Sequence, residues 1–197
     1  MDDAGQKKYK AFISYSFADK QWGDWLHRAL EVYRTPKPLV GKQTPIGPVP
    51  RRLHPIFKDR EEEAASAGIT VSIEQGLDKS EFLIVICSPR SAQSKWVNHE
   101  VAYFKRYHDP TKILTLIVDG EPGASFMPDH EAEECFPQSL LFKVDENLTV
   151  TDEAEDAPLG ADARKTGDGK RPQEAGHRLL RLLPLPPRFD AVSEITI

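Results

Sequence analysis

Glu100 stands out in the sequence because aromatic residues accompany it at helical spacing. Trp96 precedes it by four residues, and Tyr103, Phe104 and Tyr107 continue the same side. Residues four apart on an α-helix lie about 40° apart around the axis, so Trp96 and Glu100 share a face. A carboxylate in such a stripe is paired, exposed at its edge, or placed for chemistry. From spacing alone the structural interpretations are favoured, since most helical glutamates face solvent or form salt bridges.

The elements that must position this stripe alternate between short apolar runs and helical segments. Residues 10–15, 54–58, 82–87 and 113–118 are predicted strands, and residues 140–144 are a weaker fifth. The run at 82–87 is apolar throughout, which is typical of a parallel strand covered by helices on both sides. The alternation predicts a doubly wound, mostly parallel five-stranded α/β sheet with helices on both faces.

Helical segments are expected after each of the first three strands. Asp19 is the expected N-cap of the first, on which Trp22 and Trp25 are assigned to the core. Residues 69–77 form the second. Ser91 or Ser94 would cap the third, which carries Glu100 and ends near residue 108.

Ligands of open parallel sheets bind beyond the carboxyl ends of the strands. The segments 15–19, 59–68 and 88–94 are predicted to lie there. Ser16 fits two roles equally, a helix cap and a ligand contact. The glutamates at 61–63 are either a solvated face or an assembly surface.

Two further segments depart from the alternating pattern. Residues 34–53 are rich in proline without periodicity and predict a long surface loop. We expect a domain over residues 1–145, followed at 146–197 by a polar, flexible segment with a possible short helix at 177–183.

Composition narrows the classes of function. The charged share is 29%, and the formal net charge of −5 gives no reason to expect nucleic-acid or membrane binding. The polar N-terminus is unlike a secretory signal, and two cysteines make no disulfide framework, so a cytoplasmic location is expected. No histidine pairs with cysteine or carboxylate at metal-ligand spacing, so no metal is expected. The absence of a glycine-rich fingerprint after the first strand argues against a redox dinucleotide site.

Four segments together resemble the TIR (Toll/interleukin-1 receptor) domain family in its bacterial type. These are residues 12–19, 57–68, 82–89 and 94–100, in the family's order, and the resemblance covers roughly residues 8 to 120. It implies a flavodoxin-like fold, which agrees with the alternation of elements. Val97 stands where the family often has cysteine, and the 34–53 segment is longer than the usual crossover.

The resemblance also implies an activity, cleavage of NAD⁺ as substrate with no further cofactor. The family's essential glutamate falls on Glu100, with Trp96 as its partner. Tyr15, Ser16 and Phe17 would meet the nucleotide. The loop with Asp59 and Arg60 would shape the site and contact other TIR domains, in a homo-oligomer or filament that serves antiphage defence or an effector role. The alternative is a non-catalytic module that signals through TIR–TIR association.

The implied reaction requires few catalytic groups from the protein. Breaking the nicotinamide–ribose bond passes through an oxocarbenium-like state, as glycoside cleavage does. Nicotinamide leaves a cationic ring as a neutral base, so no general acid is needed. One carboxylate suffices to stabilise the developing charge and hold the ribose hydroxyls. Attack by water would give ADP-ribose and attack by adenine a cyclic product, and the sequence does not choose between them.

Overall fold

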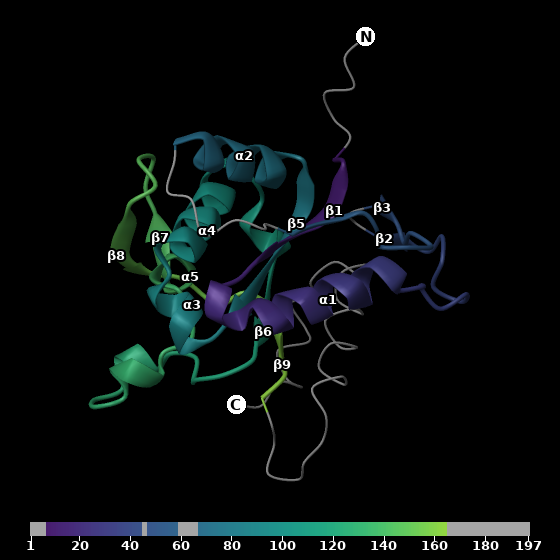
Figure 1. The fold of residues 1–197 in the computed structure, drawn as a ribbon. Coiled ribbons are helices and arrows are strands. Elements are labelled where there is room, and N and C mark those ends of the chain that lie inside the picture. Colours follow the sequence, from purple (N-terminus) through teal and green to yellow (C-terminus); the bar gives the residue numbers. More distant parts are fainter. Residues whose placement is uncertain (1–6, 45–46, 59–66, 165–197) are drawn as a thin grey trace.

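Five parallel strands form the centre of the molecule (Figure 1). The computed structural model describes residues 7–44, 47–58 and 67–164. The strand order is β4-β1-β5-β6-β9, with β4 at Ile56–Lys58, β1 at Tyr9–Ser14, β5 at Ser80–Cys87, β6 at Ile113–Ile117 and β9 at Gly160–Asp162. The direction of the connections reverses between β1 and β5, as in flavodoxin-like folds. The predicted doubly wound five-stranded α/β sheet is confirmed.

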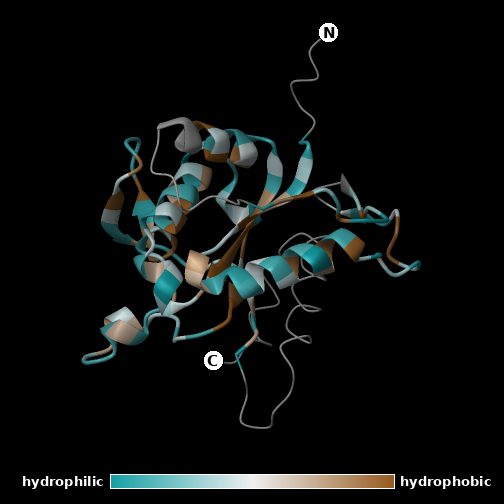
Figure 2. Ribbon diagram, viewed as in Figure 1, coloured by the Kyte–Doolittle hydropathy of each residue, from teal (hydrophilic) through white to brown (hydrophobic). Residues whose placement is uncertain are grey.

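Helices cover both faces of this sheet, because residues along each strand alternate between two apolar clusters. Ala11 and Ile13 of β1 join the cluster beneath α1 (Lys20–Val32). Phe12 joins the cluster beneath α2 (Ala67–Asp78) and α4 (Lys95–Tyr107). Figure 2 shows the hydrophobic colouring concentrated on the central strands. Cys87 is fully buried in the second cluster, and burial raises the pKa of its thiol well above the usual value.

The helix predicted to run from Ser91 or Ser94 to residue 108 is two helices. The short helix α3 (Pro89–Gln93) is capped by Ser88, whose hydroxyl accepts from the backbone N–H of Ser91. Helix α4 then starts after Ser94, which accepts from the backbone nitrogen of Val97 at 3.4 Å. Ser94 is therefore the cap of the helix that carries Glu100, and this predicted alternative is confirmed.

The fifth strand was assigned to the wrong segment. The expected run at 140–144 contains β7 (Phe142–Val144), which pairs antiparallel with β8 (Val150–Ala154) in a separate hairpin. The strand next to β6 is β9, whose sequence contains no apolar run that would predict a strand. A Cβ on Gly160 would lie 1.9 Å from Oγ1 of Thr115, so the glycine permits the close approach of β9 to β6.

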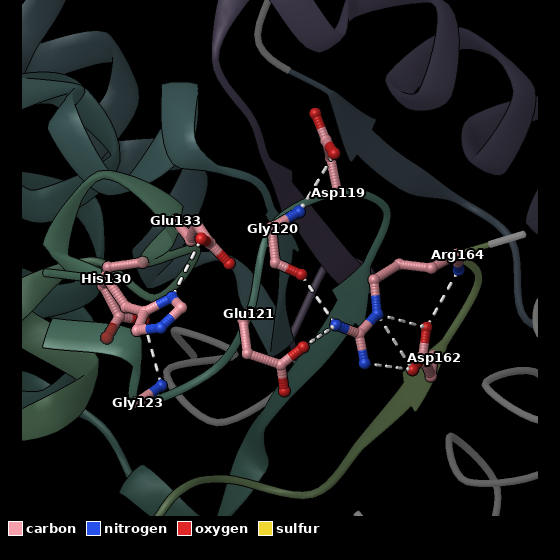
Figure 3. A network of polar contacts seen from close by, with 9 residues as sticks. Asp119, Gly120, Glu121, Gly123, His130, Glu133, Asp162 and Arg164 are labelled. Carbon is pink, nitrogen blue, oxygen red and sulfur yellow. Dashed lines mark hydrogen bonds and ion pairs between the residues drawn. The ribbon is translucent and has the colours of Figure 1, made fainter. Parts of the chain in front are cut away.

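Arg164 anchors β9 to the loop that follows β6 (Figure 3). Its guanidinium donates to the carbonyl oxygen of Gly120 at 2.7 Å, to Oε2 of Glu121 at 2.5 Å and to Oδ2 of Asp162 at 2.6 Å. The central sheet therefore includes residues 160–162, and residues 150–154 form a strand of the separate hairpin. The prediction of a flexible segment from residue 146 is wrong for these two ranges. The short helix expected at 177–183 lies outside the described residues.

The remaining elements are short. The 34–53 segment, expected to be irregular, contains a hairpin of β2 (Gln43–Thr44) and β3 (Gly47–Pro48), and Val49 and Leu53 are buried. Between β6 and β7 lie η3 (Ala124–Phe126), η4 (Glu131–Glu133) and α5 (Gln138–Leu141), while η1 (Phe17–Asp19) and η2 (Pro110–Lys112) precede α1 and β6. Within the described residues, no helix is long and apolar enough to span a membrane.

Candidate active site

Glu100 is a buried carboxylate, with only 4% of its surface exposed. It lies in α4, whose sequence alternates large apolar residues with polar ones and buries Val97, Val101 and Phe104 against the sheet. Helices of a parallel sheet run opposite to the strands, so the first turns of α4 lie near the carboxyl ends of β1 and β5. The sequence-based interpretation of Glu100 as a solvent-facing residue is excluded.

The neighbours of Glu100 along α4 define where its side chain is directed. Val97 and Phe104, which face the sheet, lie about 60° and 40° to one side of it around the helix. Tyr103, whose hydroxyl donates to Oδ1 of Asp78 in α2 at 3.2 Å, lies about 60° to the other side. Glu100 is therefore directed into the angle between the sheet and α2.

Trp96 and Tyr15 pack on opposite faces of the sheet. Trp96 is partly buried against the apolar cluster beneath α4. Tyr15, the residue after β1, packs against the cluster beneath α1. A Cβ on Gly23 of α1 would lie 3.1 Å from three atoms of the Tyr15 ring, so this glycine lets the ring lie against the helix. Trp96 and Tyr15, both predicted to contact the substrate, therefore belong to two separate apolar clusters.

The other predicted contacts differ in accessibility. Ser16 precedes η1 and is buried, and its side chain makes no capping hydrogen bond. Phe17 is 52% exposed at the carboxyl edge of the sheet. Asp59 and Arg60, together with the glutamates at 61–63, lie outside the described residues.

A polar network that sequence analysis missed joins the loops after β1 and β5. Asp19 was expected to cap α1, but its side chain makes no capping bond and is 2% exposed. Its carboxylate accepts from the Ser88 hydroxyl at 2.5 Å and from Nε and Nη2 of Arg90 at 3.0 and 2.8 Å. Nη1 of Arg90 also donates to Asp119 at 3.2 Å. The signal in the sequence is that two polar residues, Ser88 and Arg90, follow the apolar run of β5 directly.

The structure describes three buried carboxylates, and the roles of two are defined by their donors. Asp19 is held by Ser88 and Arg90. Glu134 accepts from the backbone nitrogens of Gly123, Ser125 and Phe136 and from the Ser125 hydroxyl, and so organises the loop after β6. Glu100 is the third, and it is the one on a helix face beside an aromatic residue at the ligand-binding edge.

In the described part of the chain, no group of three or more histidine, cysteine or acidic side chains could hold a metal ion. His99, whose ring nitrogen Nε2 lies 3.2 Å from Oε1 of Glu74, faces α2.

The strand order β4-β1-β5-β6-β9 defines the class of the protein as a flavodoxin-like α/β domain, and its helix α4 carries a buried carboxylate at Glu100. The family model described as Thoeris protein ThsB, TIR-like domain, matches residues 12–122, more than half of the chain. The chain belongs to this family.

Two individual proteins are similar to the chain. A protein of an Actinoplanes species, named NAD(+) hydrolase ApTIR, is 32% identical over 115 residues, which are 58% of this chain and 14% of that protein. The chain therefore spans a small part of this relative's length. The TIR domains of the activated Roq1 resistosome, in a structure with the effector XopQ, are 16% identical with a TM-score of 0.49, covering 88% of this chain and 98% of that one. A likeness this distant indicates neither activity nor partner.

Proposed function

We propose that this protein is an NAD⁺ glycohydrolase in which Glu100 is the essential carboxylate. The observation that carries the proposal is a buried carboxylate on α4, four residues after Trp96, at the carboxyl edge of the sheet. The relative named NAD(+) hydrolase ApTIR supports the choice of substrate. The family description supports a role in antiphage defence.

In this reaction the bond between C1′ of the ribose and the nicotinamide nitrogen breaks, and its electron pair neutralises the cationic ring. Water then attacks C1′ and releases a proton, giving ADP-ribose and nicotinamide. The Glu100 carboxylate stabilises the positive charge that develops on the ribose and accepts hydrogen bonds from its hydroxyls. Trp96 and the exposed Phe17 supply aromatic rings that stack on the nicotinamide.

Glu100 is covered in this structure, so the site must open before NAD⁺ reaches it. We connect this opening to self-association with other TIR domains in the cytoplasm. Turnover should then rise with protein concentration, and a dilute, verified monomer should cleave more slowly per molecule than assembled protein. Equal specific rates in the two states would rule out activation by assembly.

The deciding experiment measures NAD⁺ consumption by concentrated protein, with chromatography that separates nicotinamide, ADP-ribose and cyclic products. Glu100→Gln removes the charge and should abolish cleavage. Glu153→Gln is the matched control, because it removes the same charge at the exposed pair with Lys143 in the β7–β8 hairpin. The proposal is supported if wild type and Glu153→Gln cleave NAD⁺ and Glu100→Gln does not. No cleavage by wild type at any concentration would favour a non-catalytic signalling module.

A further inference from the structure

Ser14 carries a buried hydroxyl that has no hydrogen-bond partner among the described residues. It is the last residue of β1 and is 1% exposed. Among the buried side-chain atoms of the described residues, its Oγ is the one without a partner. Burying a hydroxyl in this way costs folding free energy that alanine would avoid, so an orphan of this kind calls for an explanation.

The pleat of β1 places Ser14 on the same face of the sheet as Glu100. Side chains two apart on a strand share a face, and Phe12 belongs to the cluster beneath α2 and α4. Val85 of β5, opposite Ser14 in the register, belongs to the same cluster. Ser14 therefore lies on the α4 side, at the carboxyl end of the strand next to the switch point.

Glu100 is directed from α4 toward the same corner of the sheet. Its side chain is directed toward the angle between the sheet and α2, and α2 lies over β1 and β4, where its Gly76 packs against Phe12 and Phe57. Glu100 is also only about 7.5 Å along the axis from the first residue of α4, close to the carboxyl edge. The topology thus brings a buried carboxylate and an orphan hydroxyl to one corner of the sheet.

We propose that Ser14 is a further substrate-binding residue, whose hydroxyl bonds to a hydroxyl of the nicotinamide-side ribose beside Glu100. This inference rests on the proposed function for the identity of the ligand. A serine hydroxyl both donates and accepts, so it complements a sugar hydroxyl whichever way that group is turned. Both protein groups are covered in this structure, so an opening that admits NAD⁺ must uncover both. The bound sugar would satisfy the orphan hydroxyl.

Ser80 provides a matched control for Ser14. It is also a fully buried serine at the end of a central strand, but at the amino edge, and its hydroxyl donates to the carbonyl oxygen of Gly76 at 2.8 Å. Ser80→Ala should lower the thermal midpoint and leave ligand binding unchanged. Ser14→Ala should leave the midpoint unchanged or raise it, and weaken binding. The two variants make the same chemical change, so opposite outcomes separate binding from folding.

The test measures binding of ADP-ribose by calorimetry and the kinetics of NAD⁺ cleavage for wild type, Ser14→Ala, Ser14→Thr and Ser80→Ala. We expect Ser14→Ala to weaken binding and raise KM by about three- to ten-fold, the effect of one hydrogen bond, and Ser14→Thr to restore most of it. An NAD⁺ analogue that lacks the contacted hydroxyl should make wild type and Ser14→Ala equal.

The possible results keep the two proposals apart. Binding by Ser14→Ala as tight as by wild type overturns the role of Ser14 and leaves the proposed function standing. ADP-ribose binding that depends on Ser14, without any NAD⁺ cleavage, supports Ser14 as a binding residue and overturns the hydrolase. Failure of the wild type to bind either compound overturns both. A lower thermal midpoint for Ser14→Ala would mark the hydroxyl as structural.

Discussion

Arg90 directs two nitrogens, Nε at 3.0 Å and Nη2 at 2.8 Å, at the same carboxylate oxygen of Asp19. The two residues belong to the loops after β5 and β1, which are neighbours in the sheet but are separated by 71 positions in the sequence. These loops flank the point at which the strand order reverses, where ligands of such sheets bind. The ion pair therefore sets the spacing of the two loops that border the candidate site.

The first prediction concerns this pair. Arg90→Ala leaves the Asp19 carboxylate buried with Ser88 as its remaining described donor, so the free energy of unfolding should fall by about 3 kcal/mol. Arg90→Lys keeps the positive charge but lacks the planar guanidinium, so its free energy of unfolding should lie between those of wild type and Arg90→Ala. Urea denaturation measures all three. As a control, Lys143→Ala at the exposed pair with Glu153 should lower the free energy of unfolding far less, because water screens that pair. Similar losses at both sites would contradict a structural role for the Asp19 pair.

The second prediction concerns the attachment of β9. Gly160→Ala places a methyl group 1.9 Å from Oγ1 of Thr115 and 2.7 Å from its carbonyl oxygen, so β9 cannot stay paired with β6 unchanged. We expect a loss of about 3 kcal/mol, at the upper end of overpacking effects. Adding Thr115→Ala removes only the hydroxyl contact and should restore part of the stability. The thermal midpoints of the single and double variants check this, and a Gly160→Ala protein as stable as wild type would be incompatible with β9 as a sheet strand.

The third prediction links α1 to the candidate site through Tyr15. Gly23→Ala would push on a ring that lies 3.1 Å from the new methyl group, and should shift Tyr15 and lower NAD⁺ cleavage several-fold. Stability should change little, because alanine gains about 1 kcal/mol over glycine in a helix and offsets the crowding. Gln21→Ala, at an exposed position of the same helix, is the control and should keep full activity. Full activity of Gly23→Ala would remove Tyr15 from the site.

The fourth prediction is a pH dependence of stability at the amino edge of the sheet. Burial and the nearby Lys7 lower the pKa of His108 below 6.5, although Asp78 acts in the opposite direction. The neutral ring is thus favoured in the folded state, and the free energy of unfolding should be highest above pH 6.5 and should fall as the pH drops toward the lowered pKa. Denaturation midpoints between pH 7.5 and 5.5 should show this fall in wild type. It should be smaller in His108→Gln, and an identical slope in the variant would assign the effect to other groups.

Local patterns in the sequence determined the elements and the placement of one key residue. The apolar runs at 82–87 and 113–118 became β5 and β6, since a strand buried on both faces needs apolar residues throughout. The spacing of Trp96 and Glu100 placed both on one side of α4, because a helix fixes angular positions within a few residues. Neither inference required knowledge of distant contacts.

The tertiary structure alone decided what the polar residues at the sheet edge do. Asp19 has the pattern of a helix cap but pairs with Arg90, because a buried carboxylate binds the strongest donors within reach, and those come from a distant part of the chain. β9 was missed because its place in the sheet depends on the space that Gly160 leaves beside Thr115, and hydropathy does not encode that space. The orphan hydroxyl of Ser14 is likewise a property of its surroundings, since a serine at the end of a strand is unremarkable until every neighbouring donor and acceptor is known.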